Sequence, residues 1–193
     1  MPDPVVHLIA GPNGAGKSTF FDHVLGPTMH LPLVNADQIA AERWPDDVVR
    51  HAYDASAVAA ERRDEMISIR RSFATETVFS HESKLALLRA ARSAGYLVTL
   101  HVIIVPEELS VARVVHRVAA GGHAVPEAKI RSRFRRLRPL VAAAIEVADT
   151  AVVYDNSSAS RPFAIVASFE RGAAIGAARW PSWAPAELRA IGC

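Results

Sequence analysis

The feature that most constrains the fold is a glycine-rich stretch near the start of the chain. Residues 11–18 read GPNGAGKS and fit the pattern G-x-x-x-x-G-K-[ST] at every position. A β-branched apolar run at 5–11 leads into them, and a helix-forming run at 17–25 follows. Between a buried strand and a helix start, such a loop turns its backbone N–H groups inward around phosphate oxygens. The sequence therefore predicts a phosphate-binding loop inside an α/β domain.

Each part of this loop has an expected task in binding ATP and Mg²⁺, the two predicted cofactors. Lys17 is expected to reach the β- and γ-phosphates, and the Ser18 hydroxyl to hold the metal. Asp155 and Asn156, at the end of a later strand, either lie near the adenine or cap a turn. The predicted ATP-binding residues are Gly11, Pro12, Asn13, Gly14, Ala15, Gly16, Lys17, Ser18, Thr19 and Asn156.

The sequence of this loop is common in ABC transporter ATPases, but the rest of the chain excludes that class of protein. Such an ATPase needs a signature of the LSGGQ kind and a run of four apolar residues that ends in Asp and Glu. The strongest apolar run, VTLHVIIVPEE, ends instead in Pro106. The glycine pair in AAGGH, at 119–123, lacks the leucine, serine and glutamine of the signature.

Strand-like and helix-like segments alternate along the chain. Strands are expected at 5–11, 31–37, 73–79, 96–105, 150–156 and 163–170, and helices at 17–25, 37–44, 51–72, 83–95, 107–122 and 125–149. This alternation predicts a mostly parallel sheet covered by helices on both faces. We therefore expect a three-layer P-loop NTPase fold of the nucleoside or small-molecule kinase type, as a single domain over 1–193, with a lid around 106–138.

Composition and length fit one soluble globular domain. Of the 193 residues, 50% are hydrophobic and 22% charged, and the formal net charge is only +2. The single cysteine, Cys193, allows no disulfide within the chain, which fits a reducing compartment. The apolar run Leu97–Val105 is interrupted by His101 and is too short to span a bilayer. We expect a cytoplasmic protein with no membrane partner.

Two carboxylates follow predicted strands at the edge where ligands bind in open α/β sheets. Asp37 lies 20 residues after Lys17 and is a candidate catalytic base, or the N-cap of the helix at 37–44. Glu76 ends the strand FATE and is expected to accept a hydrogen bond from a substrate hydroxyl or from metal-bound water. Thr77 and His81 extend this edge, so we expect Asp37, Glu76, Thr77 and His81 to bind the acceptor.

Arginines are concentrated in the expected lid. Six of them lie between 113 and 136, at 113, 117, 131, 133, 135 and 136, with glycines at 121–122 between the two groups. Arginines in a closing lid stabilise the charge that spreads over a moving phosphoryl group. Most of these side chains are expected to be solvated, and Arg117 and Arg133 are the leading candidates for catalysis, beside Lys17 and Asp37.

The chain resembles the zeta toxin family over residues 5 to about 170. The resemblance rests on five segments taken together: GPNGAGKST, NAD, ETVFS, GGHAVPE with the Arg-rich helix that follows it, and YDNS. They are most similar to its short branch, often labelled predicted ABC-type ATPases. The resemblance implies a P-loop kinase fold and ATP-dependent phosphorylation of the sugar 3′-hydroxyl of UDP-N-acetylglucosamine. It matches Asp37 to the catalytic base, Glu76 to a substrate-side glutamate and Arg117 to the first lid arginine.

The chain departs from the family pattern at three points. The second lid arginine falls at His123, so His123, Arg131 or Arg133 must supply that charge. The family's glutamate-x-threonine reads Glu76-Thr77-Val78, which displaces the threonine. The chain is also shorter than the larger toxins, with less sequence for a nucleotide-sugar pocket. His123 is kept among the expected substrate contacts.

Two other functions remain open from the sequence. A polynucleotide 5′-hydroxyl kinase would use the same loop and aspartate, with the Arg-rich segment 129–138 on a nucleic-acid backbone. The region offers only Phe134 for stacking on bases, and Phe134 fits the core better. The other alternative is a non-catalytic ATP-binding module, one half of a toxin–antitoxin pair, with an antitoxin protein as its partner.

Overall fold

The computed structural model describes residues 2–120 and 125–191. His123 and Cys193 lie outside the described residues. Within them, seven strands form one sheet in the order β2-β3-β1-β4-β5-β6-β7. The strands are β1 (Val5–Ala10), β2 (Leu33–Val34), β3 (Phe73–Thr77), β4 (Leu97–Ile104), β5 (Thr150–Asp155), β6 (Ala164–Glu170) and β7 (Ala173–Ala174).

The sheet is mostly parallel, as the alternation of segments predicts. Strands β1 to β5 pair in parallel, and only the β5–β6 and β6–β7 pairs are antiparallel. Strand β1 lies between β3 and β4, so the chain runs to one side of β1 first and to the other side later. The carboxyl end of β1 is therefore the point where the strand order switches, which is where ligands bind in such sheets.

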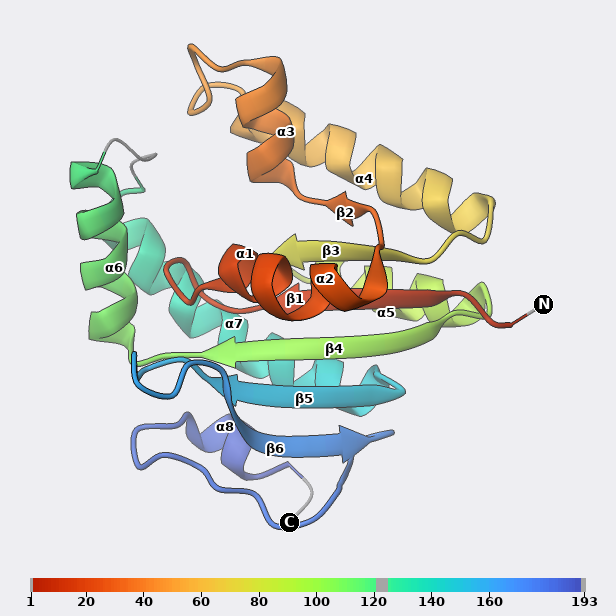
Figure 1. Cartoon of the computed structure of the whole chain (residues 1–193), viewed down its shortest axis with the longest axis vertical. Helices are drawn as coiled ribbons and strands as arrows, with labels where there is room; N and C mark the ends of the chain where they lie inside the picture. Colours follow the sequence, from red (N-terminus) through yellow and green to blue (C-terminus); the bar gives the residue numbers. More distant parts are fainter. Residues whose placement is uncertain (1, 121–124, 192–193) are drawn as a thin grey trace.

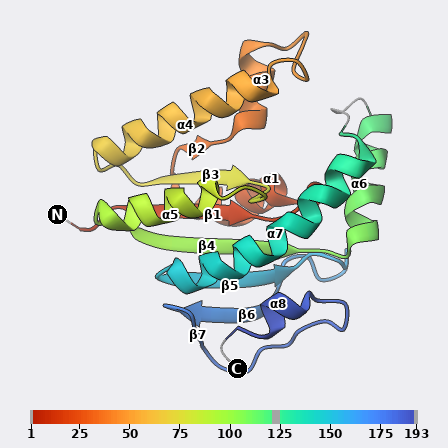
Figure 2. The same ribbon diagram turned by 180° about the vertical axis from the view of Figure 1, so that it is seen from behind.

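Helices cover both faces of the sheet and make it the middle of three layers (Figure 1). The helical segments are α1 (Lys17–Phe20), a π-helical turn η1 (Phe21–Leu25), α2 (Gly26–Met29), α3 (Ala36–Arg43), α4 (Ala52–Ser68), α5 (Ser83–Ser93), α6 (Glu107–Ala119), α7 (Glu127–Val147) and α8 (Ala186–Arg189). Helices α1 and α2 lie on one face, and α5, α7 and α8 lie on the other (Figure 2). Helices α3 and α4 stand beyond the β2 edge, and α6 stands past the carboxyl ends of the strands. The expected three-layer P-loop NTPase fold is confirmed.

The core follows from the apolar strands and from the stripe on α7. The stripe residues Ile130, Phe134, Leu137, Val141 and Ile145 are all buried, as their helical spacing predicts. Trp180 and Trp183 of the C-terminal tail pack, partly buried, against the main core, so the tail serves the packing of the fold.

Three local expectations were wrong. The helix expected at 17–25 does not end at residue 25: Pro27 lies in the first turn of α2, where its missing N–H does no harm, and the helical path continues to Met29. Asp37 is not the cap of α3, because Asn35 has extended backbone and its side-chain oxygen accepts the Asp37 N–H at 2.8 Å. The cap two residues earlier also shortens the expected strand at 31–37 to Leu33–Val34.

A search of the described helices finds none that is long and apolar enough to cross a membrane.

Candidate active site

The backbone carbonyls of the loop between β1 and α1 are held by hydrogen bonds from side chains. Four consecutive carbonyl oxygens each accept a hydrogen bond from a different side chain. The pairs are Lys17 Nζ to Pro12 O at 3.0 Å, Ser110 Oγ to Asn13 O at 2.6 Å, Arg113 Nη1 to Gly14 O at 3.4 Å and Asn156 Nδ2 to Ala15 O at 2.8 Å. The donors come from α1, α6 and the end of β5. The loop is therefore held by the helix that follows it and by two elements, α6 and the end of β5, that are far from it in the sequence.

Fixing these carbonyls also fixes the N–H groups of the loop. A trans peptide is planar, and its C=O and N–H point in opposite directions. The carbonyls held by Ser110 and Asn156 therefore leave the following N–H groups, those of Gly14 and Gly16, turned the opposite way, while the Ala15 N–H donates to Pro12 O within the loop at 3.2 Å. Such a concave row of N–H groups at a helix start binds phosphate oxygens.

Two glycines allow the loop to take this shape. Gly14 and Gly16 have φ of +71° and +92°, in the left-handed region that glycine tolerates. A Cβ at Gly14 would lie 2.8 Å from the Ser110 carbonyl oxygen, and one at Gly16 would lie 2.6 Å from Asn156 Nδ2. Both the backbone conformation and the close neighbours therefore require glycine at these positions.

Lys17 is buried at the base of the loop, with 7% of its surface exposed. Besides its bond to Pro12, its Nζ lies 3.8 Å from Glu76 Oε1. Burial lowers the pKa of Lys17, while the charges of Glu76 and Asp37 raise it and those of Arg117 and Arg133 lower it further. Two carboxylates and two guanidinium groups therefore act on one buried ammonium group.

Glu76 joins three side chains of the site. Its Oε2 accepts hydrogen bonds from Ser18 Oγ and from Asn35 Nδ2, both at 2.9 Å, and its Oε1 faces Lys17. Glu76 lies at the end of β3, directly opposite Ile9 of β1 in the parallel register, which explains why it reaches the loop. The Ser18 hydroxyl and this carboxylate are oxygen donors side by side, a set that suits Mg²⁺.

No group of three or more His, Cys, Asp or Glu side chains within the described residues could hold a metal ion by itself. Mg²⁺ is commonly held by one or two protein oxygens together with substrate phosphates and water. The pair formed by Ser18 and Glu76 fits this mode of binding, because it needs the phosphates of a nucleotide to complete the coordination.

Asp37 lies in the first turn of α3 and its side chain is exposed. Its position is set by Asn35, which caps the helix through the Asp37 N–H and also donates to Glu76. Asn35 therefore links the two carboxylates that the sequence singles out. The charge of Asp37 acts on Lys17, so the exposed carboxylate borders the mouth of the phosphate loop.

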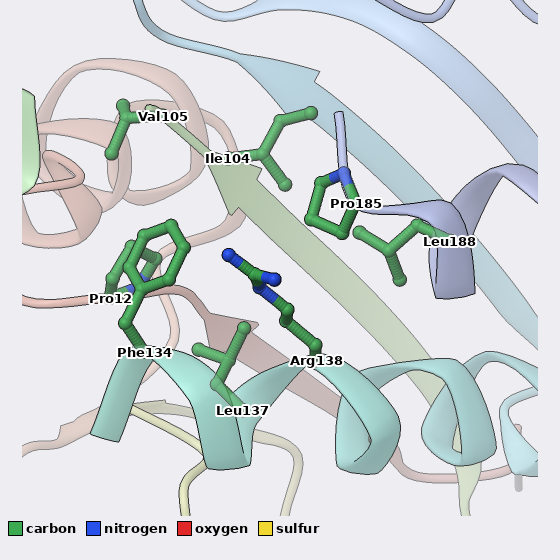
Figure 3. Close-up of a pocket in the computed structure, with 8 residues that line it drawn as sticks. All are labelled: Pro12, Ile104, Val105, Phe134, Leu137, Arg138, Pro185 and Leu188. Atoms are coloured by element: carbon green, nitrogen blue, oxygen red, sulfur yellow. The ribbon is translucent and has the colours of Figure 1, made fainter. Parts of the chain in front are cut away.

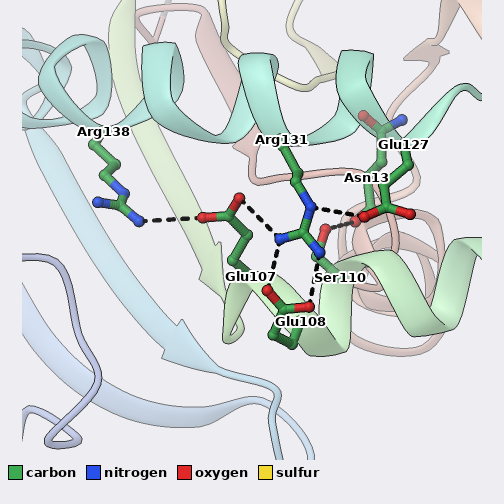
Figure 4. A network of polar contacts seen from close by, with 7 residues as sticks. All are labelled: Asn13, Glu107, Glu108, Ser110, Glu127, Arg131 and Arg138. Carbon is green, nitrogen blue, oxygen red and sulfur yellow. Dashed lines mark hydrogen bonds and ion pairs between the residues drawn. The ribbon is translucent and has the colours of Figure 1, made fainter.

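The arginines of α6 and α7 fall into two groups. Arg131 is occupied by carboxylates: it bonds Glu108 at 2.6 and 2.8 Å, Glu127 at 2.8 Å and Glu107 at 3.3 Å (Figure 4). Arg138 Nη2 lies 3.7 Å from the second oxygen of Glu107. Arg117 and Arg133 belong to the other group, because their charges act on Lys17.

Two of the predicted acceptor contacts, Thr77 and His81, make only local hydrogen bonds among the described residues. Thr77 Oγ1 accepts the Phe79 N–H at 3.2 Å, and His81 Nδ1 pairs with Ser83 at the start of α5. In the part of the chain that the structure describes, no hydrogen bond or ion pair joins either side chain to Lys17, Ser18 or Glu76. Thr19 is exposed one residue beyond Ser18.

Asn156 is buried behind the loop, and its amide binds the Ala15 carbonyl. Three further residues that contact the site were missed by the sequence reasoning: Asn35, Ser110 and Arg113. The sequence offers a reason to select Asn35, because it begins the NAD triplet directly after a predicted strand. It offers none for Ser110, because the carbonyl that Ser110 binds lies 97 residues away.

An apolar pocket lies behind the loop, at the end of β4. Its lining includes Pro12 of the loop, Phe134 and Arg138 of α7, and Leu188 of α8 (Figure 3). The Arg138 guanidinium lies over the Phe134 ring, 5.1 Å from its centre. This packing holds the rear of the loop against α7 and completes its rigid support.

Buried polar side chains also lie beneath α1. His7 Nδ1 and His101 Nε2 are 3.1 Å apart, and His101 Nδ1 lies 3.3 Å from the Tyr154 hydroxyl. Phe20 of α1 packs on His101 and Tyr154, with ring centres 5.5 and 4.7 Å away. Burial, with a smaller effect from His7, lowers the pKa of His101 to about 3, and burial raises the pKa of Tyr154 to about 12.

Comparison with known proteins agrees with this geometry. A protein-family model described as an AAA domain, AAA_33, matches residues 6–140. No curated protein is similar enough in sequence to match.

Solved structures with the same fold include toxin–antitoxin proteins and metabolite kinases. A chain from the PezAT chromosomal toxin–antitoxin system of Streptococcus pneumoniae is 17% identical with a TM-score of 0.65, over 87% of this chain and 72% of that one. A chain of the AvrRxo1-ORF1:-ORF2 complex with ATP is 17% identical with a TM-score of 0.71, over 90% of this chain and 60% of that one. Shikimate kinase from Acinetobacter baumannii is 17% identical with a TM-score of 0.52, over 81% and 86%.

At this identity the likeness concerns the fold. The expectation of a zeta-toxin-like P-loop kinase fold is confirmed, and this chain spans only about three-fifths of the AvrRxo1 chain.

Proposed function

Since the chain belongs to the AAA_33 family of AAA domains, we propose that it transfers the γ-phosphoryl group of ATP to a hydroxyl of a small molecule, in the manner of zeta toxins. One observation carries the proposal. The buried ammonium group of Lys17 lies in a phosphate-binding loop, 3.8 Å from Glu76 Oε1, and Glu76 Oε2 accepts a hydrogen bond from Ser18 Oγ at 2.9 Å. Phosphoryl transfer needs such a lysine on the phosphates, with a hydroxyl and a carboxylate beside it that can hold Mg²⁺.

The donor ATP is bound by the loop. The inward N–H groups take the phosphate oxygens, and Lys17 moves from Pro12 O to the β- and γ-phosphates. The oxygens of Ser18 and Glu76 would hold Mg²⁺ beside the phosphates. When bound, the metal neutralises charge on the β- and γ-phosphate oxygens. Asn156 keeps the loop in shape from behind and does not contact the adenine.

The transfer step uses Asp37 as the base. The acceptor oxygen attacks the γ-phosphorus as its O–H proton passes to the Asp37 carboxylate, and the bond from the γ-phosphorus to the bridging oxygen breaks to release ADP. Arg117 and Arg133 stabilise the charge on the equatorial oxygens during transfer. An exposed carboxylate suits this role, because the acceptor hydroxyl must reach it from solvent.

The acceptor is proposed from the proteins that share this fold. The resemblance to zeta toxins makes UDP-N-acetylglucosamine the first acceptor to test, with Thr77 and His81 as proposed contacts. Gluconokinase and shikimate kinase share the fold, so sugar acids and cyclic hydroxy acids are the next candidates. The likeness to a toxin–antitoxin chain supports an antitoxin protein as a further partner to test.

A polynucleotide acceptor is less favoured. Phe134, the aromatic residue of the Arg-rich segment, has 6% of its surface exposed and cannot stack on a base. An oligonucleotide therefore serves as a comparison acceptor in the test.

The decisive experiment incubates the protein with γ-labelled ATP and Mg²⁺ and a panel of acceptors: UDP-N-acetylglucosamine, gluconate, shikimate and a 5′-hydroxyl oligonucleotide. Label on one small molecule, absent with Lys17→Ala, is the expected result. Label on the oligonucleotide alone would replace the proposal with the polynucleotide kinase. Tight ATP binding without transfer to any acceptor in a wide screen would support the non-catalytic module instead.

A further inference from the structure

Ser110 has no place in any motif, yet it makes the shortest of the four bonds to the loop. It lies in the first turns of α6 and is fully buried, with 0% of its surface exposed. Its hydroxyl donates to Asn13 O at 2.6 Å, and its own carbonyl oxygen lies 2.8 Å from where a Cβ of Gly14 would stand. Helix α6 therefore contacts the loop directly.

We propose that Ser110 is a positioning residue that holds the phosphate loop in its binding conformation and ties it to the lid helix. The proposal rests on the function proposed above. Because the Asn13–Gly14 peptide is planar, holding the Asn13 carbonyl outward turns the Gly14 N–H into the phosphate cradle. Without the hydroxyl, the partly buried Asn13 carbonyl loses its donor and the peptide is free to rotate.

The same helix carries Arg117, one of the two leading candidates among the lid arginines. Ser110, Arg113 and Arg117 are spaced i, i+3 and i+7, so they lie along one face of α6. Ser110 and Arg113 bind the loop carbonyls on this face, and Arg117 comes one turn later, where its charge acts on Lys17. The face thus serves both to shape the loop and to present an arginine to the phosphates.

The beginning of α6 is fixed from its other side as well. Glu107 and Glu108 bind Arg131 of α7, and Glu107 lies near Arg138. The first turns of α6 are therefore bound on one side to the loop and on the other side to α7.

The test measures Mg²⁺-ATP and inorganic pyrophosphate binding by calorimetry for the wild type, Ser110→Ala and Ser110→Cys. Ser56→Ala is the matched control, because the Ser56 hydroxyl bonds only the Ala52 carbonyl within α4. We expect both affinities to fall about five- to tenfold in Ser110→Ala, less in Ser110→Cys, whose thiol is a weaker donor, and not in the control.

A purely structural role would lower the unfolding midpoint of Ser110→Ala and leave pyrophosphate affinity unchanged in the folded protein, which would overturn the proposal. A wild type that binds neither ligand would overturn it together with the proposed function. A loss of affinity in Ser110→Ala, in a wild type that transfers label to no acceptor, would support the role of Ser110 and reject the kinase.

Discussion

The two sides of the site differ in how firmly the fold prepares them. The donor side comprises the loop and the side chains that bind it: Lys17 and Asn156 are nearly buried, and four loop carbonyls have fixed partners. The acceptor side comprises Asp37, Thr77 and His81. Asp37 and His81 are exposed, and the hydrogen bonds of the Thr77 and His81 side chains stay within their own turns.

This difference explains why the structure indicates how ATP is bound in more detail than it indicates which acceptor is bound. Phosphate groups are the same in every ATP, so one rigid cradle serves all enzymes of this fold. Acceptors differ, and the residues that select them are placed on exposed segments that vary without disturbing the core. The following changes test whether the two sides are as separate as they look.

The largest effect is expected for Asp37→Asn. If the carboxylate acts only on the acceptor, transfer should fall by about 10²- to 10⁴-fold, because the proton of the attacking hydroxyl loses its base. ATP affinity should stay within about twofold of wild type, since the loop is untouched. Label transfer and calorimetry on the same preparation measure both, with the exposed Asp46→Asn as control. An equal loss of ATP binding would show that the two sides are not separate.

Gly16→Ala should damage the donor side next most strongly. The new Cβ would lie 2.6 Å from Asn156 Nδ2 at a φ of +92°, so the loop must shift and lose the bond to Ala15 O. We expect about 2–4 kcal/mol less stability and ATP affinity at least about tenfold weaker. Gly176→Ala is the control, because Gly176 has φ +70° and no neighbour within 4 Å. Similar losses of stability in both variants would mean that backbone strain alone matters.

Acid should loosen the donor side through His101, which supports α1. Because burial holds the pKa of His101 at about 3, the folded protein keeps this ring neutral while the unfolded chain binds a proton near pH 6.5. The stability that depends on the neutral ring is present above pH 6.5 and lost as the pH falls. One such group removes about 2 kcal/mol between pH 7 and 5.

Urea unfolding at pH 7 and pH 5 measures this dependence. His101→Gln should flatten it by about that amount, and the exposed His23→Gln should leave it unchanged. An unaltered slope in His101→Gln would assign the acid sensitivity to other groups.

Arg131→Gln should have the smallest effect, because its partners are largely exposed and screened by solvent. The melting midpoint should fall by no more than about 4 °C, and less in 1 M salt. The hydrogen bond from Arg131 lowers the pKa of Glu108. This stabilisation is therefore present above the normal glutamate pKa of about 4.3 and lost as the pH falls through the lowered value.

Differential scanning calorimetry of Arg131→Gln beside Arg135→Gln, an exposed neighbour on α7, checks this prediction. A large loss of ATP affinity in Arg131→Gln would instead show that the fixed beginning of α6 is itself part of the donor side.

Much of the fold could be predicted because its signals are local. The pattern GPNGAGKS fixes a strand, a turn and a helix start in sequence, and the stripe from Ile130 to Ile145 follows from helical period alone. The cap of α3 was misplaced because Asn35 and Asp37 are both good caps, and only the path of the chain after β2 selects between them.

The sequence by itself determined that this chain binds phosphate with a loop between β1 and α1, since backbone conformation there depends on glycines a few residues apart. Only the tertiary structure decided how that loop is held. Ser110, Arg113 and Asn156 reach it from positions about 100 to 140 residues away, because the sheet order places β4 beside β1 and β5 beside β4. A hydrogen bond between distant segments leaves no periodic trace in either of them, because each residue needs only the right atom at the right place.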